Sequence, residues 1–564
     1  MYFNIATEIL IKKLGKKGDQ MGFESFKEHS VAEFFKKNKQ MLGFSGKVRS
    51  LTTIVHEYVT NSLDAAEENR ILPTITIEIK ELEKNERYLV IVEDNAGGIP
   101  KKLLGKALGK ILAGTKFHRR MQARGQQGIG AAGCTMYSYL TTGKPIKAIS
   151  CHKNVFVEAE ISIDVNKNEP IVNILTETLS DKPGGLKIIG EFADVKYDNS
   201  QYGVLEYIKR TAIVNPALEI TFLAPDGQKL HFPRASDNLP PKPQEVLPHM
   251  LGVTPHDFYE TMKNDTDHRS IETAMVDLFA RCTKAKTTEI QELVPNISLG
   301  KKPTDITWEE ANQIVTAAKK VKWIAPSVDS VIPIGEQQLQ KALLSIINPV
   351  HYAITQRPPK VFQGGIPFIV ECALAYGGNA GKKNGQLGNL STTGEVMRFA
   401  NRVPLLFDAG GCAITEAVKT IDWKRYGIKN FDEEPITLIV NLSSVFVPYT
   451  GAGKQSIAPE EEIVDEIRFA IMETARNLQR YLSGQKREAE IASKKKALLR
   501  YVEQLATDLA ELSEQATKEE LEKTLAELVE TRYLNKDIDD ESEPPEENLE
   551  VVDKNGSNYQ EDEE

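Results

Sequence analysis

One segment, residues 51–68 (LTTIVHEYVTNSLDAAEE), constrains the fold most, because its two faces differ in chemistry. On a helix, at about 100° per residue, Glu57, Asn61 and Asp64 lie within about 60° of one another. The opposite face is apolar or small, which suits packing against a β-sheet. Its residues are Leu51, Val55, Val59, Ser62 and Ala66. The segment therefore predicts a helix that covers a sheet and presents a carboxylate one turn from a carboxamide.

The polar pair of Glu57 and Asn61 has two interpretations. A carboxylate beside a carboxamide can act as a base for water and as an oxygen ligand for magnesium. A solvated helix face contains the same residue types. The choice between the two therefore depends on the segments that follow.

Strands with a glycine-rich turn come next. Residues 74–79 (TITIEI) alternate, which is typical of a half-buried strand, and residues 88–92 (YLVIV) are continuously apolar, which favours a central one. The second run leads to Asp94, Gly97 and Gly98 in EDNAGGIP. An aspartate there can accept a hydrogen bond from an exocyclic amine, and glycines let a flat base approach the backbone. A turn capped by an aspartate is the alternative.

A glycine cluster, RGQQGIGAAG at residues 124–133, is the third motif. It runs into a predicted helix at residues 131–140, and glycines before a helix N-terminus expose N–H groups that suit phosphate oxygens. A flexible loop would contain the same residues. Because all three motifs follow one another between residues 51 and 133, we interpret them together as a nucleotide site.

These motifs resemble those of the gyrase, heat-shock chaperone, histidine-kinase and mismatch-repair (GHKL) ATPase family, E-x-x-x-N-x-x-D-A, D-x-G-x-G and a glycine-rich lid. The resemblance implies ATP and Mg²⁺ as cofactors, with Glu57 as general base, Asn61 as the Mg²⁺ ligand and Asp94 reading adenine. It further implies that nucleotide-binding residues include Gly98, Thr115, Lys116, Gly125, Gln126, Gln127, Gly128, Ile129, Gly130, Ala131 and Ala132. Two positions depart from the family pattern. Ala96 replaces the first glycine of the second motif, and Leu186 stands where threonine is usual, on the adenine side.

A distant lysine, Lys454, lies in PYTGAGKQSI at residues 448–457. The segment is not a Walker loop, because Pro448 occupies a required glycine position and Gln455 replaces serine or threonine. A solvated loop lysine is one interpretation. In topoisomerases and mismatch-repair proteins of the family, a lysine from the following domain reaches the γ-phosphate. The resemblance implies this role for Lys454, which would distinguish ATP from ADP.

Longer stretches resemble the ATPase subunits of type IIB DNA topoisomerases over most of residues 30–482. Residues 30–44 resemble an N-terminal strap and residues 241–253 the start of a helix-two-turns-helix insertion. The stretches that resemble a transducer domain are residues 321–336, 357–378 and 398–418. The implied fold is α+β and multidomain, with a GHKL (Bergerat) α/β-sandwich, the helical insertion and a transducer of the ribosomal protein S5 domain 2-like fold with a long C-terminal helix.

The function implied by this resemblance is ATP-dependent dimerisation that closes a gate on duplex DNA and drives double-strand passage, in relaxation and decatenation. The implied partners are an A-type cleavage subunit in an A₂B₂ heterotetramer, a second copy bound through the ATPase domain, and double-stranded DNA, with no membrane. A mismatch-repair-like ATP clamp and a regulatory module with weakened catalysis stay open as alternatives.

At 564 residues the chain exceeds one compact core, and it is expected to form several domains. The predicted domains are an N-terminal extension and strap (1–47), a GHKL ATPase domain (48–235), a helix-two-turns-helix domain (236–306), a transducer (307–482), C-terminal helices (483–535) and a disordered acidic tail (536–564). No run approaches the roughly 18 apolar residues of a membrane span. Five scattered cysteines without a C-x-x-C pair predict free thiols, no zinc and a reducing, cytoplasmic location. The resemblance to topoisomerase subunits implies, in addition, a prokaryotic-type location at the nucleoid.

The net charge of −10 arises in the tail, where residues 536–564 contain 13 acidic residues and two lysines. The rest of the chain is therefore close to neutral, which neither requires nor excludes DNA binding, since local basic patches can hold DNA. Candidates for such contacts are Lys284, Lys286, Lys319, Lys320 and Lys322, although solvated helix faces contain the same residues.

Several helix boundaries can also be predicted. Thr254 and Asp267 are expected to cap helices within residues 254–294, and residues 308–321 to form the first helix of a second α/β region. Strands of that region are predicted at residues 368–376 and 436–442. A long helix is expected from near Pro459, with an interruption at Gly484. Its apolar face would contain Ile463, Ile467, Ile471 and Leu478, and a capping box, Thr517 with Glu520, would open the last helix.

Overall fold

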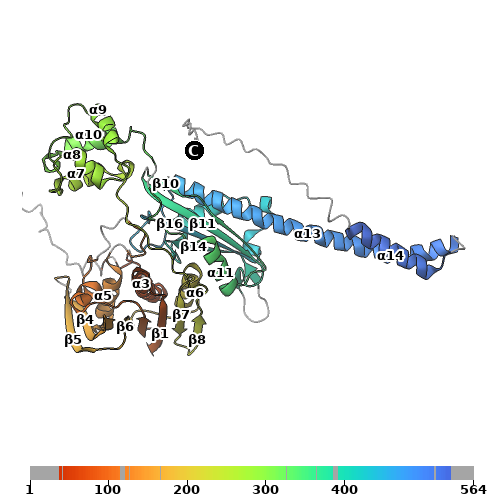
Figure 1. Cartoon of the computed structure of the whole chain (residues 1–564). Coiled ribbons are helices and arrows are strands. Elements are labelled where there is room, and N and C mark those ends of the chain that lie inside the picture. The colour runs from red at the N-terminus through yellow and green to blue at the C-terminus, as the bar shows by residue number, and fades with distance from the viewer. Residues whose placement is uncertain are drawn as a thin grey trace, which may run out of the picture. The chain divides into compact units, whose positions relative to one another are not determined.

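The structure, a computed structural model, describes residues 37, 39–40, 42–114, 121–125, 128–164, 167–324, 327–363, 365–384, 391–512 and 516–534. Most of the strap and the whole acidic tail predicted above lie outside these residues. The chain divides into two compact units, Met1–Leu478 and Gln479–Glu564. Its elements are drawn in Figure 1.

An eight-stranded sheet forms the first half of the larger unit, in the order β5-β4-β3-β6-β2-β1-β7-β8. Its strands are β1 (Thr74–Glu83), β2 (Arg87–Asp94), β3 (Ile146–His152), β4 (Val155–Asp164), β5 (Glu169–Leu179), β6 (Gly184–Ala193), β7 (Glu219–Leu223) and β8 (Lys229–Phe232). β1 and β7 are parallel, whereas the other neighbours are antiparallel. β2 is central, as its apolar run predicted. Its residues nevertheless alternate between buried and half-buried, which shows that one face of the strand is covered more fully than the other.

Four helices pack on this sheet: α3 (Lys47–Glu68), α4 (Lys101–Gly109), α5 (Gly130–Thr142) and α6 (Val204–Val214). The predicted helix is α3, and its apolar face is buried as expected: Leu51, Val55 and Val59 are 0% exposed. They join residues of β1, β2 and α5 in one hydrophobic core. The face of α3 turned away from this core is left to form a site.

A helical cluster follows an irregular, proline-rich stretch at residues 233–248. Its elements are η1 (Met250–Gly252), α7 (Pro255–Lys263), α8 (Ile271–Leu278), α9 (Lys284–Leu293), η2 (Pro303–Asp305) and α10 (Trp308–Ala318). Thr254 caps α7, as predicted, in a capping box with Asp257. The expected cap at Asp267 is wrong, because Ser270 caps α8 through the N–H of Thr273.

The placement of α10 also differs from the prediction. This helix was expected to open the second α/β region, but it packs on α7, and Ala311, Ile314 and Val315 belong to the core of the helical cluster. A helix with one apolar face can pack on either neighbour, and its own pattern does not say which. The domain limits given above remain predictions.

A second sheet follows, in the order β10-β11-β16-β14-β15, with β9 also paired to β11. Its strands are β9 (His351–Gln356), β10 (Lys360–Phe362), β11 (Ile366–Tyr376), β14 (Glu395–Ala400), β15 (Val403–Pro404) and β16 (Ile436–Ser444). β11 and β16 are the two predicted strands, both almost wholly buried. Other elements here are α11 (Glu336–Ile346), the hairpin β12 (Lys382–Asn384) and β13 (Ser391–Thr393), η3 (Ala409–Gly411), α12 (Ala413–Lys419), η4 (Trp423–Tyr426) and η5 (Phe431–Glu433).

Two helices end the described chain, α13 (Glu461–Leu512) and α14 (Lys518–Leu534). The predicted apolar face of α13 is confirmed, since Ile463, Ile467, Ile471 and Leu478 are 0% exposed. The predicted interruption at Gly484 is wrong, because α13 continues through it. One glycine costs a helix only about 1 kcal/mol, which strong helix formers on both sides offset. The capping box of Thr517 and Glu520 opens α14 as predicted.

The five cysteines are all free and buried, in agreement with the prediction of free thiols. Among the helices that the structure describes, none has both the length and the apolar character needed to cross a membrane.

Candidate nucleotide-binding site

The predicted catalytic face of α3 divides into an accessible part and a buried part. Asn61 is exposed and Glu57 is half-buried, so both side chains can meet a ligand. Asp64 is buried and accepts a hydrogen bond from Arg124 Nη1 at 2.9 Å. Helical spacing thus places the three residues on one side, but it does not reveal that only two of them are accessible.

Glu57 lies against the first turn of α5. A Cβ atom added at Gly130, the first residue of that helix, would lie 1.8 Å from Glu57 Oε2. Any larger residue at this position would displace the carboxylate. The candidate base is therefore held next to the helix N-terminus that the glycine motif predicted as a phosphate site.

Asp94 lies at the end of β2, as predicted, and its carboxylate is buried. It accepts hydrogen bonds from Ser62 Oγ at 2.6 Å and from the backbone N–H groups of Ala96 at 3.0 Å and Leu186 at 3.2 Å. Burial raises the pKa of this carboxyl group, although the three bonds oppose the rise. Ala96 and Leu186, the two residues that depart from the family pattern, thus bind Asp94 through backbone N–H groups. These hydrogen bonds do not depend on the side chains at the two positions.

Gly98 is required by the packing of its turn. Its φ is 65°, a conformation that favours glycine, and a Cβ atom there would lie 1.9 Å from the carbonyl oxygen of Cys151 in β3. This glycine therefore holds the turn after Asp94 close to the sheet.

The turn predicted to wrap phosphate lies beside α3. Gly125 donates its N–H to Asp64 Oδ2 at 3.3 Å, and a Cβ atom added at Gly125 would lie 3.4 Å from Asn61 Oδ1. Gly128 has a φ of 59°, which again favours glycine. The two ends of the turn thus bring backbone groups next to the candidate Mg²⁺ ligand and the candidate base.

The other predicted residues of this turn differ in exposure. Ile129 directly precedes α5 and, like Ala131, is half-buried against the core, and Ala132 is buried within it. Four predicted contacts, from Thr115, Lys116, Gln126 and Gln127, lie outside the residues that the structure describes and stay predictions.

Lys454 reaches this turn from the loop between β16 and α13. Its Nζ donates a hydrogen bond to the carbonyl oxygen of Arg124 at 3.0 Å, across 330 residues of sequence. The pKa of His56 is lowered by burial, against the effect of Glu57, and the charge of Lys454 lowers it further. Lys454 therefore brings its charge close to α3 and to the start of the turn predicted to wrap phosphate.

Comparisons with known proteins agree with this geometry. Residues 46–169 match the family "Histidine kinase-, DNA gyrase B-, and HSP90-like ATPase", and residues 326–495 match "Topoisomerase VI B subunit, transducer". The B subunit of type 2 DNA topoisomerase 6 from Methanothermobacter thermautotrophicus is 46% identical over 495 residues, covering 87% of this chain and 93% of that protein. The proteins of the same name from Thermococcus gammatolerans and Pyrococcus horikoshii are 41% and 42% identical, each over 92% of this chain and over 98% and 97% of their own lengths. The chain belongs to the family of type 2 DNA topoisomerase 6 B subunits.

The two family matches confirm the predicted fold class, a GHKL ATPase domain combined with a topoisomerase VI B transducer. Among solved structures, the ATPase region of Saccharomyces cerevisiae topoisomerase II aligns with 82% of this chain and 99% of its own, at 11% identity and a TM-score of 0.39. That likeness is too weak to bear on the assignment.

The position of Gly130 gives a first test of the base in this topoisomerase chain. Gly130→Ala is expected to lower ATP turnover by about 100-fold, because the added methyl group displaces Glu57 and general-base catalysis contributes about 10²–10⁴-fold. Steady-state hydrolysis and the melting temperature of the full chain measure activity and folding. Gly410→Ala is the control, since a Cβ atom there meets nothing within 4 Å. Unchanged turnover in the Gly130 variant would contradict the placement of the base.

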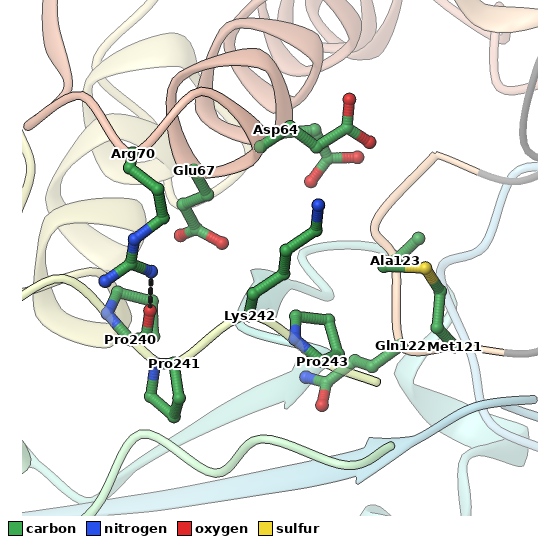
Figure 2. A pocket seen from close by; sticks show the side chains of 11 residues that line it. Asp64, Glu67, Arg70, Met121, Gln122, Ala123, Pro240, Pro241, Lys242 and Pro243 are labelled. Carbon is green, nitrogen blue, oxygen red and sulfur yellow. Dashed lines mark hydrogen bonds between the residues drawn. The ribbon is translucent and has the colours of Figure 1, made fainter. Parts of the chain in front are cut away.

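Sequence reasoning missed one part of the site in this topoisomerase chain, a buried ion cluster behind the phosphate turn. It consists of Asp64, Glu67, Arg124 and Arg402. Three of these residues lie in the motifs themselves, but neither helical spacing nor glycine spacing reveals a pairing with residue 402. A cavity borders the cluster, lined by the end of α3, residues 121–123 and the linker residues 240–243 (Figure 2).

Proposed function

We propose that the chain binds and hydrolyses ATP as the B subunit of a type IIB DNA topoisomerase. ATP-dependent dimerisation through the ATPase domain closes a gate on double-stranded DNA. Strand passage, in relaxation or decatenation, then uses breaks made by a separate partner, which resembles the A subunit of topoisomerase VI and completes an A₂B₂ heterotetramer. The contact of Lys454 with the carbonyl of Arg124 supports this most, because it links the candidate γ-phosphate sensor to the nucleotide site within one chain.

The accessible residues fit the chemistry of ATP hydrolysis. In the proposal, Glu57 takes the proton of the water that attacks the γ-phosphorus, and ADP and inorganic phosphate are the products. Asp94, at the end of β2, accepts a hydrogen bond from the adenine amine. In the proposal, the buried Asp94 meets the base of the nucleotide and the exposed Asn61 meets its phosphate end.

Mg²⁺ fits the carboxamide oxygen of Asn61. In the part of the chain that the structure describes, no three His, Cys, Asp or Glu side chains are grouped to hold a metal ion. Mg²⁺ does not need such a cage, since it is usually bound by one or two side chains together with substrate phosphates. When bound, it would neutralise charge on the phosphate oxygens.

The alternatives that the motifs left open gain no support from the relatives. The three proteins named above are type 2 DNA topoisomerase 6 B subunits, aligned over at least 87% of this chain. Neither the mismatch-repair-like clamp nor the weakened regulatory module is therefore favoured.

The helical cluster offers lysines for DNA. Lys286 is already paired with Glu289 at 2.7 Å, whereas four other candidates are exposed: Lys284, Lys319, Lys320 and Lys322. Replacing these four with alanine is expected to make log K less steep against log salt by about 0.9 for each lost phosphate contact. DNA-binding titrations at several salt concentrations measure the slope. Lys286→Ala is the control, and an unchanged slope in the fourfold variant would rule out DNA contact by these lysines.

The proposed function is tested by co-purification. A stable complex with a partner that carries a cleaving tyrosine should relax supercoiled DNA, and only when both ATP and Mg²⁺ are present. Relaxation by this chain alone, or by the complex without ATP, would contradict the proposal.

A further inference from the structure

The segment that leads into the phosphate turn, residues 121–124, is held at three consecutive positions by residues that follow the helical cluster. We call it the lid segment. The contacts are the Gln122 N–H to the Ser330 carbonyl (3.2 Å), Asn401 Nδ2 to the Ala123 carbonyl (3.3 Å) and Lys454 Nζ to the Arg124 carbonyl (3.0 Å). The lid segment therefore cannot move far without either breaking these bonds or carrying the second sheet and its loops with it.

The side chain of Arg124 adds an ionic connection. Its Nη1 and Nη2 donate to Glu67 at 3.0 and 2.7 Å, and Nη1 also donates to Asp64. Arg402, in the tight turn between β14 and β15, donates to the same Glu67 carboxylate at 2.8 and 3.2 Å. Glu67 is thus shared between an arginine of the lid segment and an arginine of the second sheet.

Burial makes it costly to keep these groups charged. The side chains of Arg124 and Arg402 are 3% and 8% exposed, and burial acts against the charge of each. Burial would also raise the pKa of Glu67, but the two guanidinium groups bring it below its usual value. A buried ion pair of this kind is weak evidence of added stability, but removal of one partner is costly because it leaves a buried charge uncompensated. Loss of Arg402 would leave the Glu67 carboxylate with Arg124 as its one remaining guanidinium partner in the cluster.

The cluster leaves two of its own donors unused. The Nε groups of Arg124 and Arg402 are buried without a hydrogen-bond partner among the described residues. Asp64 and Glu67 line the cavity beside them, and Figure 2 shows Lys242 extending from the linker toward Asp64. Buried polar groups without partners are uncommon in a native structure and call for an explanation.

The connection continues into the second sheet. The backbone N–H of Arg402 donates to Asn441 Oδ1 at 3.2 Å, and Asn441 Nδ2 donates to Glu371 at 2.9 Å. Glu371, buried in β11, accepts the N–H groups of Ile334 and Gly335 just before α11. Hydrogen bonds therefore lead from the phosphate turn across β16 and β11 to a helix of the second sheet.

We propose that Arg402 is a positioning residue for ATP turnover, which locks the lid segment to the transducer through Glu67 and Arg124. This assignment rests on the proposed function and adds a second residue to it. Lys454 would sense the phosphate, whereas Arg402 would keep the lid segment in place next to Lys454. In this assignment Arg402 acts through Glu67 and Arg124 and not by contact with the nucleotide.

The test compares two buried arginines that join the same two regions of the chain. Arg402→Gln is expected to lower both kcat and triphosphate-driven dimerisation by about tenfold, a usual size for coupling between sites, while ADP affinity stays within about threefold. Arg210→Gln is the matched control. This substitution breaks a buried ion pair with Glu395 in β14 (2.6 Å) but does not touch the lid segment. It should change kcat, triphosphate-driven dimerisation and ADP affinity by no more than about twofold each.

Two further variants test whether the loss of kcat arises from loss of folding. Arg402→Lys keeps the charge and should recover part of kcat. Glu67→Gln/Arg402→Gln removes both charges and should lower kcat as much as Arg402→Gln, at a melting temperature closer to wild type. Equal losses in the Arg402 and Arg210 variants, or a normal kcat in Arg402→Gln, would overturn the assignment. A wild-type chain that hydrolyses no ATP would instead reject the proposed function, and this assignment with it.

Discussion

Glu57→Ala is expected to reduce ATP turnover by at least about 100-fold and to leave dimerisation driven by a triphosphate intact. The carboxylate is the candidate base beside the phosphate turn, where a Cβ atom at Gly130 would lie 1.8 Å from it. In the proposal, binding of the nucleotide depends on other groups, among them Asp94 and the phosphate turn, and the substitution leaves these in place. Release of inorganic phosphate measures turnover, and sedimentation of the same sample measures dimerisation.

The control for this prediction is Glu68→Ala, at the exposed C-terminal end of the same helix. It should hydrolyse ATP within about twofold of wild type, as surface substitutions usually have small effects. Hydrolysis by Glu57→Ala at the wild-type rate would remove Glu57 as the base, whatever the state of the dimer.

Lys454→Ala is expected to separate nucleotide state from strand passage. Its Nζ contacts the lid segment, and in the proposal it pairs with the γ-phosphate, which ADP lacks. Without this charge, ATP and ADP should produce nearly the same dimer affinity, and DNA relaxation by the complex should fall by about 100-fold, the upper part of the range for coupling between sites. Dimer affinity with each nucleotide and gel assays of relaxation test both parts.

A conservative variant and a surface control accompany Lys454→Ala. Lys454→Arg keeps a positive charge and should retain part of the preference for ATP. Lys419→Ala, exposed at the end of α12, should behave as wild type. Normal strand passage by Lys454→Ala would exclude the sensor role.

The motifs predicted much of the geometry of the candidate site because they are local. A carboxylate and a carboxamide one turn apart on α3, an aspartate at the end of β2 and glycines before α5 each depend on a few neighbouring residues. Their positions follow from helix and strand geometry alone. The roles of these residues in catalysis and binding stay predictions.

Other features depended on contacts between distant segments. Asp64 lies on the predicted face but is buried, because Arg124 covers it. Arg402 pairs with Glu67 across 335 residues, which no local pattern encodes. Gly484 stays helical, since a propensity penalty of about 1 kcal/mol is small beside the rest of a 52-residue helix. Only the resemblance, and not the spacing of residues, pointed to Lys454.

The central claim is that a triphosphate, and not a diphosphate, brings two copies of this chain together with Lys454 on the terminal phosphate. Sedimentation velocity of the full chain with a non-hydrolysable ATP analogue and Mg²⁺, compared with ADP and Mg²⁺, tests it most directly. We expect a dimer with the analogue and a monomer with ADP, and loss of that difference in Lys454→Ala. A monomer with both nucleotides, or the same dimer with both, would contradict the claim.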